Sequence, residues 1–411
     1  RVTCSRIAVR VVPICVVLCA PLAGCAVEVN VYEDLIRPAA VSDPIDWKQA
    51  EKGILENHLQ LTFADRFVKA GEAYFSPDDS RIIFQAVGVP AASEAADEFY
   101  AMFIADLVRD DAGRITGLDD IMRISPSGSA NTCGWFHPTD PNVVIFASTI
   151  GPPGEATPPG FERLSGRYRW MFPPQMKIVR CRLDTTAGAA DSLDVLLGDD
   201  QAYQAECTLS RDGRHLLFCS MESNRGDLFV KDLLTGRLAR IVQSQAYDGG
   251  PFFSPDGRRI CFRADRGRQH YLQLFVGELA FNEDGTIVAL NREYQLTDNE
   301  HVNWAPFWHP NSRYLVYATS EVGHHNYEVF VLDADGGDVP GSTGTIKYGT
   351  RRRRITHAGG ADILPAFNAD GTTMMWTSQR GDGGKSQLWV ADFVMDLESK
   401  PTSNDAEHSS N

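Results

Sequence analysis

The chain contains 411 residues, of which 43% are apolar, and carries a formal net charge of −15 at pH 7. This composition is ordinary for a globular protein and provides enough apolar material for a large core. The negative charge argues against a nucleic-acid partner, because binding to phosphates requires clustered Lys and Arg side chains.

The N-terminal segment, residues 1–25, has the pattern of an export signal. Three arginines lie within the first ten residues, and an apolar stretch at 11–22 follows them. That stretch is too short for a comfortable transmembrane helix, and small residues come after it. Leu22-Ala23-Gly24-Cys25 resembles a bacterial lipobox, which implies a lipoprotein anchored to the membrane through Cys25. A simple secretory signal with cleavage elsewhere is the alternative, and both predict an extracytoplasmic, periplasmic protein.

Residues 26–56 are predicted to be a tether followed by a short helix. No periodicity is present up to Pro44. Beyond it, Trp47, Ala50 and Ile54 recur at helical spacing, and Asp46 is a candidate N-cap. We therefore expect the folded domain to begin near residue 57.

Residues 57–396 contain six copies of a strand–turn–strand unit. The clearest copy, at 251–262, reads Pro-Phe-Phe-Ser-Pro-Asp-Gly-Arg-Arg-Ile-Cys-Phe. Proline presets φ in its tight turn, while Asp and Gly tolerate the left-handed angles that reverse the chain. The turn residues that align across the copies are Ser76, His137, Ser210, Ser254, His309 and Asn368.

Two further strands complete each period. An aromatic and aliphatic run follows each unit, for example Tyr271 to Val276, and a short strand precedes each unit, for example Gln295-Leu296-Thr297. Four short strands per period, repeated at this spacing, are typical of propeller blades. The sequence therefore predicts an all-β fold, a six-bladed β-propeller with four-stranded antiparallel blades.

The two ends of the repeat region are predicted to close the ring. The last unit has only three strands of its own, so Gln60-Leu61-Thr62 is expected to supply the outer strand of the sixth blade. Such closure would remove two exposed sheet edges. The polar tail at 397–411 is expected to be disordered.

The repeat resembles a known family. Recurrent Phe-Ser-Pro-Asp-Gly-x-x-Ile-x-Phe units, with Gln-Leu-Thr or Arg-Ile-Thr strands ahead of them, resemble the TolB-like propellers related to WD repeats. The resemblance covers His58 to Phe393. It implies a periplasmic, non-enzymatic binding scaffold without a cofactor, whose partner is an envelope protein or a peptidoglycan-associated protein.

A candidate ligand site lies where the chain enters the inner strands, because these entrances ring one mouth of a propeller channel. Polar side chains recur there, six residues before the aligned turn residue, and Lys69, Glu72, Glu206 and His301 are close to them. Short polar side chains also satisfy free backbone groups at strand entrances, and this structural interpretation is favoured. The candidate ligand-binding residues are Glu72, Asn131, Gln204, Asp248, Asn303 and Asp362.

The largest insertion, residues 151–174, interrupts the second unit. Long loops in compact domains are usually functional or disordered. This loop begins with a Pro/Gly segment and ends in an aromatic, cationic patch that suits a partner-docking surface. Capping of the neighbouring blade is the alternative. The candidate docking residues are Arg167, Tyr168, Arg169, Trp170 and Phe172.

Histidines in the last third of the chain suggest a different function. Oligogalacturonate lyases are similar propellers that hold a catalytic metal through histidines and an amide. This resemblance makes His301, His309 and His357 the alternative metal ligands of a metal-dependent, carbohydrate-active enzyme. His309 nevertheless occupies an aligned turn position, so the repeat alone explains it. Because the sequence has no Gly-x-Ser-x-Gly, His-Glu-x-x-His or dinucleotide-binding motif, we expect a non-enzymatic protein that binds no metal.

Five cysteines follow the signal segment, an odd number. Cys207 and Cys219 flank one hairpin and could pair in an oxidising compartment. Burial of free thiols as small apolar groups is the favoured interpretation.

Overall fold

The computed structural model describes residues 46–92, 96–154, 160–162, 167–169, 173–184, 189–268, 270–334, 337–338, 346–347, 349 and 351–398. These residues belong to a compact unit that spans Ile45–Asn411. Cys25 and the rest of the expected signal peptide lie outside the described residues, as do the expected tether up to residue 45 and the tail from residue 399.

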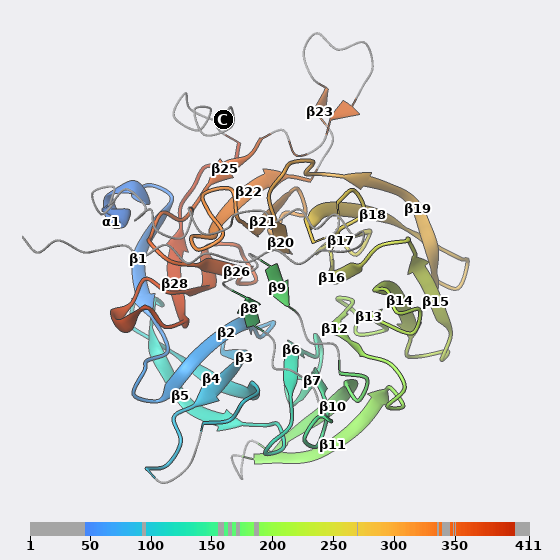
Figure 1. The fold of residues 1–411 in the computed structure, drawn as a ribbon, viewed down its shortest axis with the longest axis horizontal. Helices are drawn as coiled ribbons and strands as arrows, with labels where there is room; N and C mark the ends of the chain where they lie inside the picture. The colour runs from blue at the N-terminus through green and yellow to red at the C-terminus, as the bar shows by residue number, and fades with distance from the viewer. Residues whose placement is uncertain are drawn as a thin grey trace, which may run out of the picture. The chain divides into compact units, whose positions relative to one another are not determined.

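Within the described residues, six four-stranded antiparallel sheets follow one another around a ring (Figure 1). Each of the first five blades is built from strands in chain order. Blade one contains β2 (Phe67–Phe75), β3 (Arg81–Gly88), β4 (Ala101–Arg109) and β5 (Ile115–Arg123). Blade two contains β6 (Asn131–Phe136), β7 (Val143–Ser148), β10 (Lys177–Asp184) and β11 (Ala189–Leu197). Blade three contains β12 (Gln204–Leu209), β13 (His215–Ser220), β14 (Asp227–Asp232) and β15 (Leu238–Val242).

The remaining blades complete the ring, so the predicted six-bladed propeller is confirmed. Blade four contains β16 (Asp248–Phe253), β17 (Arg259–Ala264), β18 (Gln273–Phe281) and β19 (Ile287–Gln295). Blade five contains β20 (Asn303–Trp308), β21 (Tyr314–Thr319), β22 (Glu328–Asp333) and β25 (Arg353–Arg354). Blade six contains β26 (Asp362–Phe367), β27 (Thr373–Ser378), β28 (Gln387–Phe393) and β1 (Leu55–Gln60). Two small hairpins, β8 (Gly160–Glu162) with β9 (Arg167–Arg169) and β23 (Gly337–Asp338) with β24 (Ile346–Lys347), lie outside these sheets.

The repeated turn is held by its own side chains. In blade four, the Ser254 hydroxyl donates to Asp256 Oδ1 at 2.6 Å and accepts from the Arg259 amide at 2.9 Å. Gly257 adopts a φ of 70°, which glycine reaches without steric cost. The same serine–aspartate hydrogen bond recurs between Ser76 and Asp78 at 2.6 Å, so the sequence repeat encodes one local structure.

Strand β1 closes the ring as predicted. It pairs antiparallel with β28, in a register that places Leu55 opposite Phe393 and Gln60 opposite Trp389. The strand begins earlier than the predicted segment because Leu55 is buried in the core of the last blades. The pairing continues past Gln60, where the Leu61 amide donates to the Leu388 carbonyl at 2.8 Å.

The helix expected between Asp46 and Leu55 is shorter than predicted. It comprises only α1 (Trp47–Ala50), and Asp46 caps it by accepting from the Gln49 amide. Helix formation stops there because Leu55 is required in the closing strand.

The second strand of each blade is almost wholly buried and forms the core between neighbouring sheets. Such strands read as continuous apolar runs because both of their faces are covered. The five described cysteines are free thiols, and Cys207 and Cys219 do not pair.

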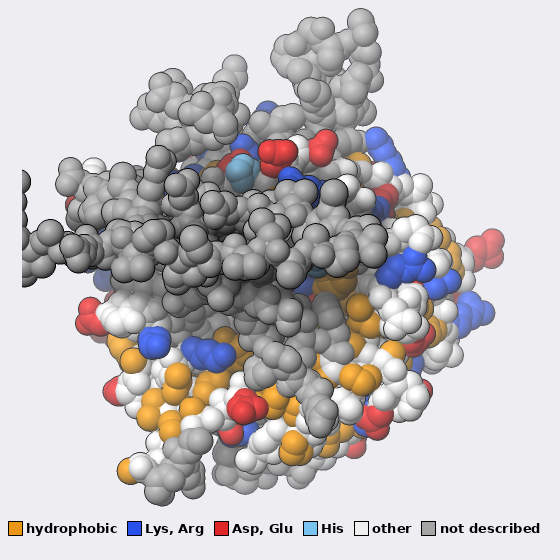
Figure 2. Space-filling view, viewed as in Figure 1, with side chains coloured by type: hydrophobic (Ala, Val, Ile, Leu, Met, Phe, Trp, Pro, Cys, Tyr) orange, Lys and Arg blue, Asp and Glu red, His pale blue; other side chains and the backbone are white. Residues whose placement is uncertain are grey.

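Charged side chains are interspersed around the described part of the face shown in Figure 2, and Lys and Arg do not gather there into one basic patch. This distribution fits the net negative charge of the chain. No helix within the described segments has the length and apolar character that a membrane span requires.

Candidate ligand site

A β-bulge recurs at one position of every inner strand, four residues before the aligned turn residue. The register of the inner strand shifts there in all six blades. The bulge residues have left-handed backbone angles, with φ between 41° and 58°. They are Glu72, Cys133, Glu206, Gly250, Ala305 and Leu364. Five of them are not glycine, and a left-handed angle costs such residues roughly 1–2 kcal/mol each. Backbone strain of this kind clusters at functional sites.

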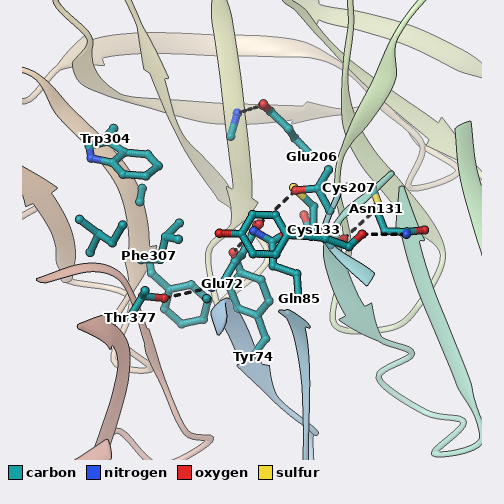
Figure 3. Close-up of a pocket in the computed structure, with 18 of the residues that line it drawn as sticks. Glu72, Tyr74, Gln85, Asn131, Cys133, Glu206, Cys207, Trp304, Phe307 and Thr377 are labelled. Carbon is teal, nitrogen blue, oxygen red and sulfur yellow. Dashed lines mark hydrogen bonds between the residues drawn. The ribbon is translucent and has the colours of Figure 1, made fainter. Parts of the chain in front are cut away.

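All six bulge residues line a cavity of about 250 Å³ at the centre of the ring (Figure 3). Bulges re-aim side chains, and here each blade contributes its bulge residue to the same space. The lining is polar on one side and apolar on the other. Glu72, Cys133 and Glu206 supply the polar side, while Ala305 and Leu364 supply the apolar side.

Four aromatic rings from four blades meet at one end of this cavity, and three of them, Tyr74, Phe252 and Phe307, line it. Tyr74, Trp135, Phe252 and Phe307 occupy the same repeat position, two residues before the aligned turn residue. Each ring contacts the other three, with centroids 5.2 to 6.3 Å apart. Because these rings come from different sides of the ring of blades, their mutual contact fills the channel axis. We call this cluster the aromatic floor.

Glu206 is neutralised by a cation within the cavity wall. The Arg263 guanidinium donates to Glu206 Oε1 at 3.0 Å, and the Tyr247 hydroxyl donates to the same oxygen at 2.8 Å. The Gly250 amide also donates to this carboxylate. A Cβ atom at Gly250 would overlap the Arg263 guanidinium, so the blade-four bulge must be glycine for this arrangement.

Glu72 is buried without a cation. It is 8% exposed, and its carboxylate accepts from the Tyr74 hydroxyl at 3.2 Å and from the Thr132 hydroxyl at 3.1 Å. In the described part of the chain, no Lys or Arg forms an ion pair with it. Burial raises the pKa of Glu72, although the hydrogen bonds from Cys133, Thr132 and Tyr74 act in the opposite direction.

The structure brings only part of the predicted ligand-binding set to the cavity. Glu72 and Asn131 line it, whereas Gln204, Asp248, Asn303 and Asp362 are not among its lining residues. These four lie at the first position of their inner strands. A role for them in ligand binding stays a prediction.

Their polar groups are engaged by neighbouring parts of the protein. Gln204 donates to Glu222 at 2.7 Å, and Asn303 donates to Asn299 at 2.8 Å. Asp248 pairs with Arg266 at 2.8 Å, and Asp362 pairs with Arg380 at 2.8 Å. The bulge positions two residues further on supply the cavity-lining side chains. Comparing the six copies at the position four residues before the aligned turn residue would have identified Glu206 together with Glu72.

The alternative metal ligands do not gather at one place. His309 Nδ1 accepts from the Asn311 amide at 3.3 Å, and its ring packs against Phe367. The His357 amide donates to Glu51 at 2.7 Å, and the His301 amide donates to Asn299 at 3.1 Å. Across the described segments, no group of three or more His, Cys, Asp and Glu side chains is arranged to hold a metal ion.

The candidate docking loop is described only in part. Residues 167–169, with Arg167, Tyr168 and Arg169, form β9, which pairs with β8. Trp170 and Phe172 lie outside the described residues. Its role as a docking surface therefore stays a prediction.

Comparisons with known proteins identify TolB relatives over part of the chain. No family model matches it. An uncharacterized protein of Agrobacterium fabrum is 27% identical over 136 residues, which are 32% of this chain and 43% of that protein. A protein TolB homolog of Chlorobium luteolum is 22% identical over 181 residues, which are 44% of this chain and 35% of the homolog. The matches thus span less than half the length of these curated relatives.

Among solved structures, a putative TolB from Agrobacterium tumefaciens is similar to this chain. It superposes with a TM-score of 0.45 at 16% identity, over 79% of this chain and 90% of that chain. The fold itself rests on the strand pairing described above. The described residues thus form a six-bladed β-propeller, and 181 residues of the chain are similar to a protein TolB homolog.

Proposed function

We propose that the protein is an exported, non-enzymatic binding scaffold of the bacterial cell envelope and that its central cavity is its ligand site. The observation that carries this proposal is the repeated bulge. Six backbone positions with left-handed angles, one from each blade and five of them strained, converge on one cavity that the aromatic floor closes at one end. A cavity with a mixed polar and apolar lining of this kind suits a small molecule or a side chain of a partner protein.

The chemistry of the lining favours binding over catalysis. Burial raises the pKa of the Cys133 thiol well above its ordinary value, and the carboxylates of Glu72 and Glu206 raise it further. A thiol in this state is a poor nucleophile. Glu206 is held by Arg263 and Tyr247, so its carboxylate is engaged in structure.

The envelope location and the partner are further parts of the proposal. A TolB homolog among the relatives and the lipobox-like Leu22-Ala23-Gly24-Cys25 support an extracytoplasmic protein with a lipid anchor at Cys25. We place its partner among envelope proteins or peptidoglycan-associated proteins. The insertion that carries Arg167, Tyr168, Arg169, Trp170 and Phe172 is the proposed docking surface.

Membrane fractionation and affinity capture of the full chain test this proposal. The intact protein should fractionate with membranes, and Cys25→Ala should move it to the soluble periplasmic fraction. The intact chain should also capture a specific envelope protein after crosslinking, and a variant without residues 161–172 should lose it. Cytoplasmic retention of the intact chain, or unchanged partners after the deletion, would contradict the corresponding part of the proposal.

A further inference from the structure

We infer that the central cavity binds a small organic cation, a primary amine on an apolar body, with its ammonium group against Glu72 and Gln85 and its body against the aromatic floor. This inference rests on the proposed function, because it names the ligand class of the same cavity. It is carried by four features of the lining residues: an unpaired carboxylate, an unpartnered amide oxygen, aromatic faces and a negative charge balance.

The first feature is the hydrogen bonding of Glu72. Its carboxylate accepts from neutral groups: the Tyr74 hydroxyl at 3.2 Å, the Thr132 hydroxyl at 3.1 Å and the Cys133 thiol. A carboxylate has about four acceptor sites, so these three neutral donors leave acceptor capacity. Burial of a carboxylate is costly unless a positive charge compensates for it. The described residues supply no such charge to Glu72, and a bound ammonium group would.

The second feature is Gln85, which lies on β3 next to this carboxylate. Gln85 pairs with Gly71, the residue directly before Glu72, and both Gln85 and Glu72 line the cavity (Figure 3). Gln85 is 5% exposed, and its Oε1 has no hydrogen-bond donor among the described residues. Buried acceptors are nearly always satisfied in native proteins. Glu72 and Gln85 together therefore form an acceptor wall that a ligand with several N–H groups would complete.

The third feature is the aromatic surface beside that wall. Tyr74, Phe252 and Phe307 of the aromatic floor line the cavity, and Trp304 lines it from blade five. Aromatic faces attract cations electrostatically and also bury apolar groups. They favour a ligand that carries a positive charge on an apolar body over a highly polar ligand.

The fourth feature is the charge balance of the lining. The acidic lining residues are Glu72, Glu98 and Glu206, and the basic ones are Lys69 and Arg263. Arg263 is already paired with Glu206 at 3.0 Å, and the Lys69 ammonium lies over the ring of Tyr100, 4.3 Å from its centroid. Both basic groups thus interact with other side chains, and neither forms an ion pair with Glu72 among the described residues. An anionic ligand would face this uncompensated carboxylate.

Calorimetric titration of the purified full chain with matched probes tests the inference. The amines butylamine, phenethylamine and tryptamine are compared with their alcohol counterparts butanol, 2-phenylethanol and tryptophol, and with the anion phenylacetate. At least one amine should bind roughly tenfold or more tightly than its alcohol, as expected for a charge-assisted hydrogen bond. The anion phenylacetate should bind more weakly than the matching alcohol 2-phenylethanol.

Three variants locate the binding. Glu72→Gln keeps the shape of the side chain and should weaken the amine roughly tenfold while leaving the alcohol unchanged. Gln85→Met, which removes the other acceptor, should weaken the amine severalfold. Glu283→Gln removes an exposed carboxylate that does not line the cavity, and it should change no affinity by more than about twofold. Thermal unfolding of each variant checks that it folds.

The outcomes separate this inference from the proposed function. If an alcohol or phenylacetate binds more tightly than the matching amine, or if Glu283→Gln loses as much amine affinity as Glu72→Gln, the cation inference is overturned and a ligand-binding cavity remains. If no probe binds at millimolar concentration, the cation inference fails, while envelope capture still decides the scaffold proposal.

Discussion

The carboxylate of Glu51 accepts hydrogen bonds of 2.9 and 3.1 Å from the Arg380 guanidinium, although 329 residues separate the two in the chain. Both side chains are fully buried. Arg380 also pairs with Asp362 at 2.8 Å and lies over the ring of Trp47, 4.4 Å from its centroid. The residues before β1 are thus bound to blade six by a buried charge network in addition to strand pairing. We call the Glu51–Arg380 pair the latch.

Breaking the latch should strongly destabilise the propeller. Glu51→Ala leaves the buried Arg380 with one fewer carboxylate and should lower the free energy of unfolding by about 3–5 kcal/mol. Urea denaturation followed by circular dichroism measures this change. The control is Arg237→Ala, which breaks an exposed ion pair with Asp284 and should cost less than about 1 kcal/mol. Similar losses in the two variants would show that the latch adds no more than a surface ion pair.

Alanine at Gly250 should cost more than alanine at Gly257. Both glycines have left-handed angles, with φ of 58° and 70°, so both substitutions carry a backbone penalty of about 1–2 kcal/mol. Only at Gly250 would the new Cβ overlap Arg263, whereas nothing lies within 4 Å at Gly257. Overpacking should add roughly 1–3 kcal/mol at Gly250. Equal unfolding free energies for the two variants would contradict the packing argument for the cavity wall.

Removing one ring of the aromatic floor should destabilise the centre of the ring. Phe307→Ala deletes contacts with Tyr74, Trp135 and Phe252 and should lower the free energy of unfolding by about 2–4 kcal/mol. Phe281, which is 45% exposed, is the matched control, and its replacement by alanine should cost less than about 1 kcal/mol. A small loss for Phe307→Ala would mean that the four rings contact without supporting the fold.

His357 should make the stability of the protein fall in mild acid. Burial lowers the pKa of His357 from 6.5 to about 4, and the positive charge of Arg354 adds to this effect. Between these two values the unfolded chain binds a proton that the folded chain does not bind. The stabilisation is therefore complete above pH 6.5 and decreases as the pH falls toward 4.

Urea unfolding at pH 7.5 and pH 5.0 measures this effect. The intact protein should lose about 1–2 kcal/mol more than His357→Gln over this interval. Glu51, whose pKa is lowered from 4.5 in the folded protein, acts mainly below that interval and in the same direction. Replacement of the exposed His270 by glutamine should leave the pH dependence unchanged. If the free energy of unfolding of His357→Gln falls between pH 7.5 and 5.0 as much as that of the intact protein, His357 is not the residue responsible.

Much of the architecture could be predicted because it is encoded locally and six times over. Turn units such as Ser254-Pro-Asp-Gly fix a hairpin within a few residues, and the apolar second strands fix the core. Ring closure was also predictable from a missing strand in the last unit, since an unpaired sheet edge demands a partner. The start of β1 was misjudged because the burial of Leu55 depends on residues of blades five and six.

The cavity could be predicted only in outline. The sequence placed polar residues at the strand entrances, and of these Glu72 and Asn131 reach the cavity. It did not reveal that a bulge four residues before each aligned turn residue brings the bulge residue itself to the cavity, because a bulge depends on the register between two strands.

By itself, the sequence determined the number of blades, the strand order within them and the closure of the ring, since each depends on a pattern that recurs along the chain. Only the tertiary structure decided which side chains share the cavity, that Arg263 neutralises Glu206, and that Glu72 has no cation beside it. Those relationships join residues from different blades, and the distances between blades are set by packing rather than by any local pattern.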